Sequence, residues 1–205
     1  MHTQFLRSHS PASLLAMVLM ALPMAAAAHT GIENHIHPGF LAGFVHPLTG
    51  FDHLAVMLAV GLWSALAARR AGPDMLWGPV GFAAMLLLGA MAGLKGLQVP
   101  AVEPMIAASV LVTGLLVITR LRVSGIAAAL LVGVFAVFHG LAHGYELVGN
   151  ADAAITLAGM LAATVLLHAT GLAIGWALRS ASVWVPRLAG AGVALFGALL
   201  LARLA

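Results

Sequence analysis

Long apolar stretches, separated by short charged or turn-forming segments, fill most of this chain and restrict its fold more than any other feature. Six such stretches can be separated, at residues 41–68, 75–94, 104–119, 123–143, 152–178 and 186–204. A helix of about 20 apolar residues crosses the hydrocarbon core of a bilayer, and a helix satisfies its backbone hydrogen bonds without water. The pattern therefore predicts an all-α membrane protein, a bundle of six transmembrane helices in a lipid bilayer.

The composition excludes the main alternatives to a membrane protein. Of the 205 residues, 62% are hydrophobic and 7% are charged, whereas soluble domains carry about 25% charged residues. Disordered chains are rich in charge and poor in apolar residues, so disorder is excluded as well. The absence of cysteine excludes disulfide scaffolds, thiolate metal sites and cysteine nucleophiles. The net charge of +3 is too small to indicate nucleic acid as a partner.

The first 28 residues have the three parts of a secretory signal peptide. Arg7 lies in a polar start, an apolar run extends from Leu14 to Leu22, and four alanines at 25–28 provide a small-residue cleavage site. Cleavage after Ala28 would leave His29 at the mature N-terminus, outside the cytoplasm. We therefore expect a cleaved signal peptide (1–28), an extracytoplasmic histidine-containing segment (29–40) and a six-helix transmembrane domain (41–205).

The charges of the loops agree with this orientation. With the mature N-terminus outside, three loops face the cytoplasm and hold six arginines: Arg69, Arg70, Arg120, Arg122, Arg179 and Arg187. The outward-facing segments hold only Lys95 and Arg203 as basic residues. An excess of basic residues is typical of cytoplasmic loops. The sequence thus predicts a multi-pass protein of the bacterial inner membrane, with the mature N-terminus and the C-terminus outside the cytoplasm.

Ionisable side chains inside the apolar stretches are the strongest indication of function, because they are costly in a membrane and usually face a bundle interior. The first stretch contains His46, Asp52 and His53. The two histidines are seven residues apart, which returns them to nearly the same face of a helix. Asp52 could be a ligand itself, or it could accept a hydrogen bond from an imidazole and fix its tautomer.

A second group, His139, His143 and Glu146, ends the fourth stretch. Spacings of four and three residues put its members on one helical face, and two histidines four residues apart can hold one metal ion. Because the first helix runs inward and the fourth runs outward, both groups lie toward the extracytoplasmic side at similar depth. The topology predicts a shared metal or proton site formed by His46, Asp52, His53, His139, His143 and Glu146.

Four further histidines extend the set of candidate ligands. His168, in the fifth stretch, lies deeper in the membrane. It is either a hydrogen-bonded core residue or a further site on the path of the metal ion or proton. His29, His35 and His37 follow the cleavage site and either capture a cation or belong to a plain tail. Imidazole and carboxylate ligands without thiolate suit Ni²⁺, Co²⁺, Cu²⁺ or Zn²⁺.

The two groups lie within two longer motifs. The first reads His46-Pro47-x-x-Gly50-x-Asp52-His53-x-x-x-Met57-x-x-Val60-Gly61, and the second reads Phe138-His139-Gly140-x-Ala142-His143-Gly144-x-Glu146. Both resemble the signatures of the HupE/UreJ family, and the resemblance covers essentially the whole mature chain. It implies a nickel or cobalt permease, or a metallochaperone-like accessory protein, associated with hydrogenase and urease. It also implies nickel as the metal, a metal-binding role for the six residues, and maturation proteins of nickel enzymes as partners.

These observations together predict facilitated diffusion of a divalent transition metal, nickel or else cobalt, across the inner membrane to supply a metalloenzyme such as hydrogenase or urease. The chain would be a transporter and not an enzyme, and it has no Walker A loop for ATP hydrolysis. Three other classes stay open: a metal-binding accessory protein that does not conduct, a haem protein with paired axial histidines, and an intramembrane zinc-type metallohydrolase with Glu146 as its base. The oligomeric state stays open as well.

Overall fold

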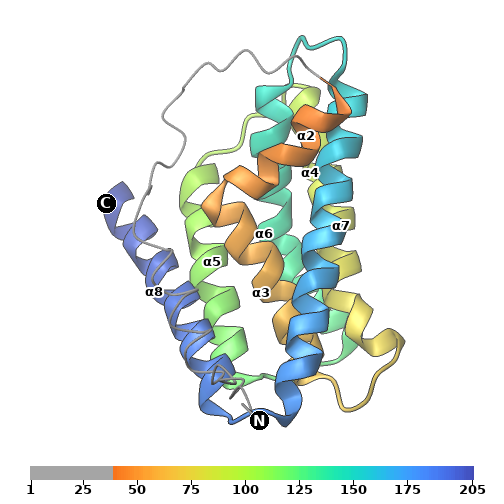
Figure 1. Cartoon of the computed structure of the whole chain (residues 1–205). Helices are drawn as coiled ribbons and strands as arrows, with labels where there is room; N and C mark the ends of the chain where they lie inside the picture. Colours follow the sequence, from red (N-terminus) through yellow and green to blue (C-terminus); the bar gives the residue numbers. More distant parts are fainter. Residues whose placement is uncertain (1–38) are drawn as a thin grey trace, which may run out of the picture. The chain divides into compact units, whose positions relative to one another are not determined.

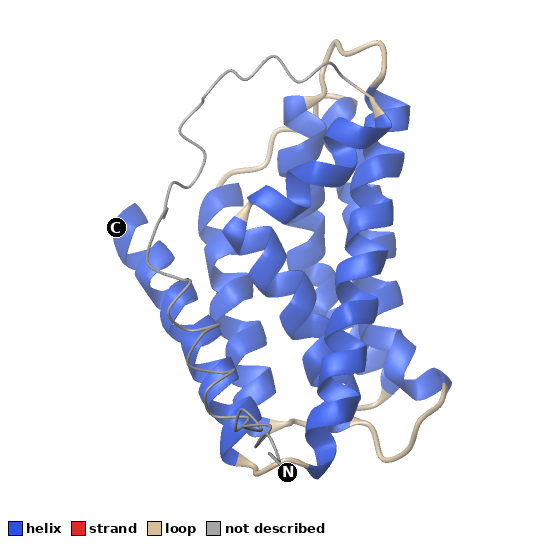
Figure 2. Cartoon of the chain, viewed as in Figure 1, coloured by secondary structure: helices blue, strands red, loops and turns tan. Residues whose placement is uncertain are grey.

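The computed structural model describes residues 39–205, and all the regular structure within them is helical (Figure 2). The α-helices are α2 (Phe40–Thr49), α3 (Phe51–Ala67), α4 (Trp77–Leu94), α5 (Val102–Thr119), α6 (Gly125–Glu146), α7 (Ala153–Ala177) and α8 (Trp184–Leu204). Two 3-10 turns, η1 (Pro73–Leu76) and η2 (Leu178–Ser180), precede α4 and follow α7. The predicted signal peptide and the three histidines His29, His35 and His37 lie outside the described residues.

Five of the described helices are long and apolar enough to cross a membrane: α4 with η1, α5, α6, α7 with η2, and α8. Their outer surfaces carry large apolar side chains, and Leu88, Ile126, Leu130 and Leu195 are each more than half exposed. The histidines of the same helices are buried instead. A protein surrounded by lipid favours an apolar outer surface, with its polar groups buried inside the bundle. The chain is a multi-pass membrane protein.

The first predicted helix, residues 41–68, is wrong as one continuous element, because it consists of α2 and α3 bent by 82°. Gly50 between them has an extended backbone, with φ −80° and ψ 108°. Its N–H donates to the carbonyl of His46 (3.2 Å) where α2 ends, and its carbonyl accepts from the N–H of Leu54 (2.8 Å) where α3 begins. Pro47 lies inside α2 and not at the break.

The bent pair nevertheless follows the whole length of α7. At one end the N–H of Gly39 donates to Thr156 Oγ1 (3.1 Å). At the other end Arg179 donates to the carbonyl oxygens of Ala65 (3.1 Å) and Arg69 (3.0 Å). With 25 residues and a rise of 1.5 Å per residue, α7 is about 37 Å long, more than the hydrocarbon core of about 30 Å. Figure 1 shows α2 and α3 beside α7. Counting the pair as one span gives six, the predicted number.

The helices pack mainly in pairs, α4 with α6, α5 with α8 and α3 with α7, and α3 also contacts α5. Glycines let the backbones of α4 and α6 touch. A Cβ at Gly140 would overlap the carbonyl of Leu86, and a Cβ at Gly89 would overlap the carbonyl of Val137. Small residues at such contacts let two transmembrane helices approach closely. A Cβ at Gly39, in contrast, would meet no heavy atom within 4 Å.

We expect Gly140→Ala to lower the free energy of unfolding by about 1–3 kcal/mol, the usual cost of overpacking, because the new methyl group would meet the backbone of α4. Gly133→Ala is a matched control on the same helix. Its Cβ would meet mainly the Met85 side chain, whose Cγ is 2.9 Å away and can turn aside. Thermal unfolding in detergent measures the difference, and equal melting temperatures for the two variants would contradict the inferred backbone contact.

Candidate metal centre

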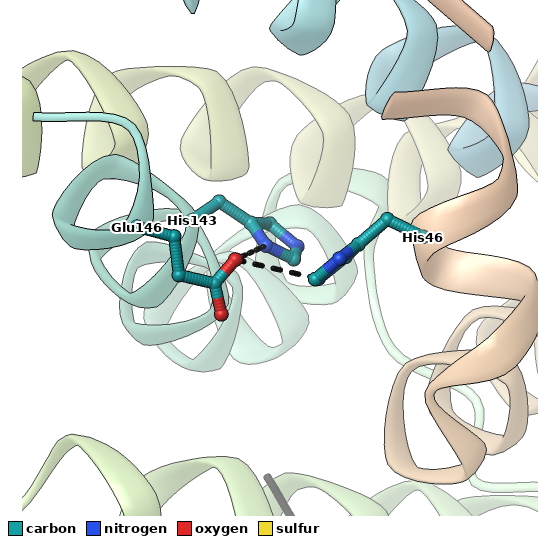
Figure 3. A group of neighbouring side chains, drawn as sticks. All are labelled: His46, His143 and Glu146. Atoms are coloured by element: carbon teal, nitrogen blue, oxygen red, sulfur yellow. Dashed lines mark ion pairs between the residues drawn. The ribbon is translucent and has the colours of Figure 1, made fainter. Parts of the chain in front are cut away.

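Three of the predicted site residues meet where α2 faces the end of α6. His46 lies in the last turn of α2, and His143 and Glu146 lie in the last turn of α6. Glu146 Oε2 is 3.4 Å from His46 Nε2 and 3.7 Å from His143 Nδ1. Figure 3 shows the three side chains turned toward one another from the two helices.

These three residues, here called the accessible cluster, have the properties of a metal site that ions can reach. One ligand atom from each residue lies within 4.8 Å of the other two. The side chains of His46 and Glu146 are 30% and 38% exposed, whereas that of His143 is 1% exposed. Two imidazoles and one carboxylate form a donor set that suits divalent transition metals.

His53 and His139, here called the buried pair, lie deeper in the bundle. His53 of α3 is 1% exposed and His139 of α6 is fully buried. Their ring centroids are 4.8 Å apart. The ring of His143 lies 4.6 Å from that of His53 and 5.0 Å from that of His46. His143 therefore connects the buried pair with the accessible cluster.

Asp52 orients His53. Its Oδ1 is 2.8 Å from His53 Nδ1 and also accepts the backbone N–H of His53 at 2.8 Å. Since an ionised carboxylate can only accept, Nδ1 carries the proton and the lone pair is on Nε2. Gly50 leaves room for this contact, because a Cβ there would lie 3.2 Å from both Asp52 Oδ1 and His53 Nδ1. Of the two roles open for Asp52, this geometry favours the acceptor that fixes a tautomer.

Ser109 of α5 orients His139, and the sequence did not single it out. The hydroxyl donates to the carbonyl of Ile106 (2.6 Å), and Ser109 Oγ is 2.8 Å from His139 Nε2. Because the hydroxyl has one proton, Oγ accepts from the Nε2–H of His139, which leaves the lone pair on Nδ1. The only signal in the sequence is a serine in an apolar stretch, and bonding to its own helix explains such a serine equally well.

His168 of α7 lies beyond a phenylalanine. The ring of Phe82, from α4, has its centroid 5.7 Å from that of His139 and 5.2 Å from that of His168. His168 is 3% exposed, and its Nε2 has no hydrogen-bond partner among the described residues. The interpretation of His168 as a hydrogen-bonded core residue therefore finds no support at this nitrogen.

The structure thus brings the six residues predicted for the shared site into one series of contacts and places His168 apart from them. That these residues bind metal stays a prediction.

Comparison with known proteins agrees with the two motifs. The HupE / UreJ protein family matches residues 16–200. Protein HupE of Rhizobium leguminosarum bv. viciae is 40% identical over 188 residues, which covers 90% of this chain and 94% of that protein. No solved structure matches the chain. Since the family match spans most of the sequence and includes both motifs, the chain belongs to the HupE/UreJ family.

Proposed function

We propose that this protein carries a divalent transition metal, nickel or else cobalt, passively across the bacterial inner membrane toward metalloenzymes such as hydrogenase or urease. One observation carries the proposal: imidazoles follow one another from the accessible cluster through His53 to His139, inside an apolar bundle. Ionisable groups at successive depths are typical of ion pathways in membranes. Membership of the HupE/UreJ family supports a role in metal handling.

The loop contacts support an inward direction of transport. The indole N–H of Trp63 donates to the carbonyl of Leu121 (2.9 Å), and Arg179 donates to that of Arg69 (3.0 Å). The α3–α4, α5–α6 and α7–α8 loops therefore share one end of the bundle. These loops and the first turn of α8, which holds Arg187, carry the six arginines. The accessible cluster lies toward the other end, where α6 finishes. The positive-inside rule then directs the cluster away from the cytoplasm.

In this mechanism an arriving ion exchanges water for the two imidazoles and the carboxylate of the accessible cluster. It moves on to His53 and His139, then past the Phe82 ring to His168. Inward movement of a divalent ion yields about 4.6 kcal/mol per 100 mV of inside-negative potential, twice the value for a single charge. That free energy supports a concentration ratio of more than about a thousandfold, so no ATP hydrolysis is needed.

The first test is Ni²⁺ uptake by liposomes that contain the purified protein, followed with a fluorescent indicator inside. We expect saturable uptake whose initial rate rises with inside-negative potential, because the ion carries two charges. His53→Ala should reduce uptake to that of protein-free liposomes. Stoichiometric Ni²⁺ binding without uptake would contradict a permease and favour an accessory protein. A tightly held, non-exchanging Zn²⁺ would favour the metallohydrolase.

Glu146 supplies the carboxylate of the accessible cluster, and its negative charge should strengthen the binding of Ni²⁺. Two unit charges about 4 Å apart interact by about 4 kcal/mol at an effective dielectric constant of about 20. Solvent screens part of this at Glu146, which is 38% exposed. We therefore expect Glu146→Gln to raise the half-saturating Ni²⁺ concentration about tenfold. Asp152→Asn is the matched control, because this carboxylate is exposed at the start of α7. An equal effect of both substitutions would show that only surface charge matters.

The orientation is tested with enzyme fusions in a bacterial host. Alkaline phosphatase folds only outside the cytoplasm, where its disulfides form. A fusion after Arg203, near the C-terminus, should therefore be active, whereas a fusion after Arg70, in the α3–α4 loop, should be inactive. The reverse pattern would overturn the proposed orientation and with it the inward direction of transport.

A further inference from the structure

In each histidine of the buried pair, a neighbouring side chain determines which ring nitrogen carries the proton. The two neighbours lie on different helices. Asp52 accepts the Nδ1 proton of His53, and Ser109 accepts the Nε2 proton of His139. Each neutral ring then keeps one lone pair, on Nε2 of His53 and on Nδ1 of His139. The Nδ1 of His139 is buried and has no hydrogen-bond partner among residues 39–205. A buried acceptor of this kind requires an explanation, and an unseen ion is one of the usual ones.

We propose that His53 and His139 form a second station for the divalent cation, separate from the accessible cluster, and that Ser109 is the positioning residue that keeps the Nδ1 lone pair of His139 available to it. The rings are 4.8 Å apart and nearly perpendicular, at 87°. Imidazole nitrogens bind such ions at about 2.1 Å, so two rings at this centroid spacing can bind one ion between them. Both rings are held by hydrogen bonds at their other nitrogen, as histidine ligands of metals usually are.

The donor set makes this station weaker than the accessible cluster. It offers two imidazoles, while its nearest carboxylate, Asp52, is engaged with His53. The accessible cluster offers two imidazoles together with the carboxylate of Glu146. A conducted ion needs sites that it can leave, so a weaker second station suits onward transfer. This transfer role rests on the proposed function, whereas binding at the buried pair can be measured without transport.

Ser109 and Thr113 form a matched pair for the test. Both hydroxyls are buried on α5, one turn apart. The Thr113 hydroxyl donates to the carbonyl oxygens of Ser109 (2.8 Å) and Val110 (3.1 Å), on its own helix. Ser109→Ala removes the acceptor of His139, so the ring loses its fixed tautomer. Loss of a group that orients a metal-binding histidine typically reduces metal affinity or activity by about 10- to 100-fold. Thr113→Val removes a hydroxyl from the same region without this consequence.

The direct test is nitrogen NMR of the full chain in lipid nanodiscs, with ¹⁵N-labelled histidine and Zn²⁺ as a diamagnetic probe. Signals are assigned with His139→Asn and His53→Asn. Before addition of metal, His139 should be protonated at Nε2. Zn²⁺ should then shift the signals of His139 Nδ1 and His53 Nε2. Ser109→Ala should weaken that response about tenfold or more, and Thr113→Val should leave it unchanged. Zn²⁺ shifts confined to His46 and His143, or equal responses of the two α5 variants, would overturn the second station.

Ni²⁺ uptake by the same variants separates this inference from the proposed function. Ser109→Ala should lower the maximal uptake rate about tenfold while the half-saturating concentration, set by the accessible cluster, changes by less than about twofold. Ser109→Thr, which keeps a hydroxyl, should retain the rate. If the alanine variant does not fold, the Zn²⁺ shifts of His139 Nδ1 and His53 Nε2 in the wild type decide the inference. Zn²⁺ binding at the buried pair without any uptake by the wild type would contradict the proposed transport function but support the second station. Normal uptake without Zn²⁺ binding at the buried pair would support transport but contradict the second station.

Discussion

The cost of burying an imidazole in a bundle surrounded by lipid governs how this protein is built. Four histidines, His53, His139, His143 and His168, are at most 3% exposed, in a medium without water to satisfy their nitrogens. Each therefore needs a protein partner or an ion. Asp52 and Ser109 supply partners for one nitrogen each of His53 and His139. Nδ1 of His139 and both ring nitrogens of His143 have no hydrogen-bond partner among the described residues, and the proposed path for a cation passes these two rings.

The bend at Gly50 makes this arrangement possible. A straight first helix would carry His46 and His53 two turns apart along one axis. The bend of 82° instead points α2 across the end of α6, so that His46 reaches His143 and Glu146 while His53 lies beside His139. The same glycine admits the Asp52–His53 hydrogen bond, because a side chain at position 50 would press on it. The residue at the bend thus also leaves room for the hydrogen bond by which Asp52 fixes the tautomer of His53.

Close helix packing and site geometry depend on each other. Gly140 and Gly144 alternate with His139 and His143 along α6, and each of these glycines lies against the backbone of α4. The contact sets the depth and rotation of α6, and therefore the positions of both histidine rings. Phe82, on the same α4, then comes to lie between His139 and His168. Small residues that bring two helices together also determine which side chains line the interior.

The sequence by itself determined the all-α membrane fold, the number of spans and the meeting of two ionisable groups. Few structures satisfy the hydrogen bonds of a polar backbone in lipid. Because successive spans alternate in direction, a group early in one span lies at the same depth as a group late in another. Tertiary structure alone decided the break at Gly50, the division into an accessible cluster and a buried pair, the role of Ser109 and the place of Phe82. These depend on how each helix is rotated about its axis. That rotation follows from contacts such as Ser109–His139, 30 residues apart, which no local pattern records.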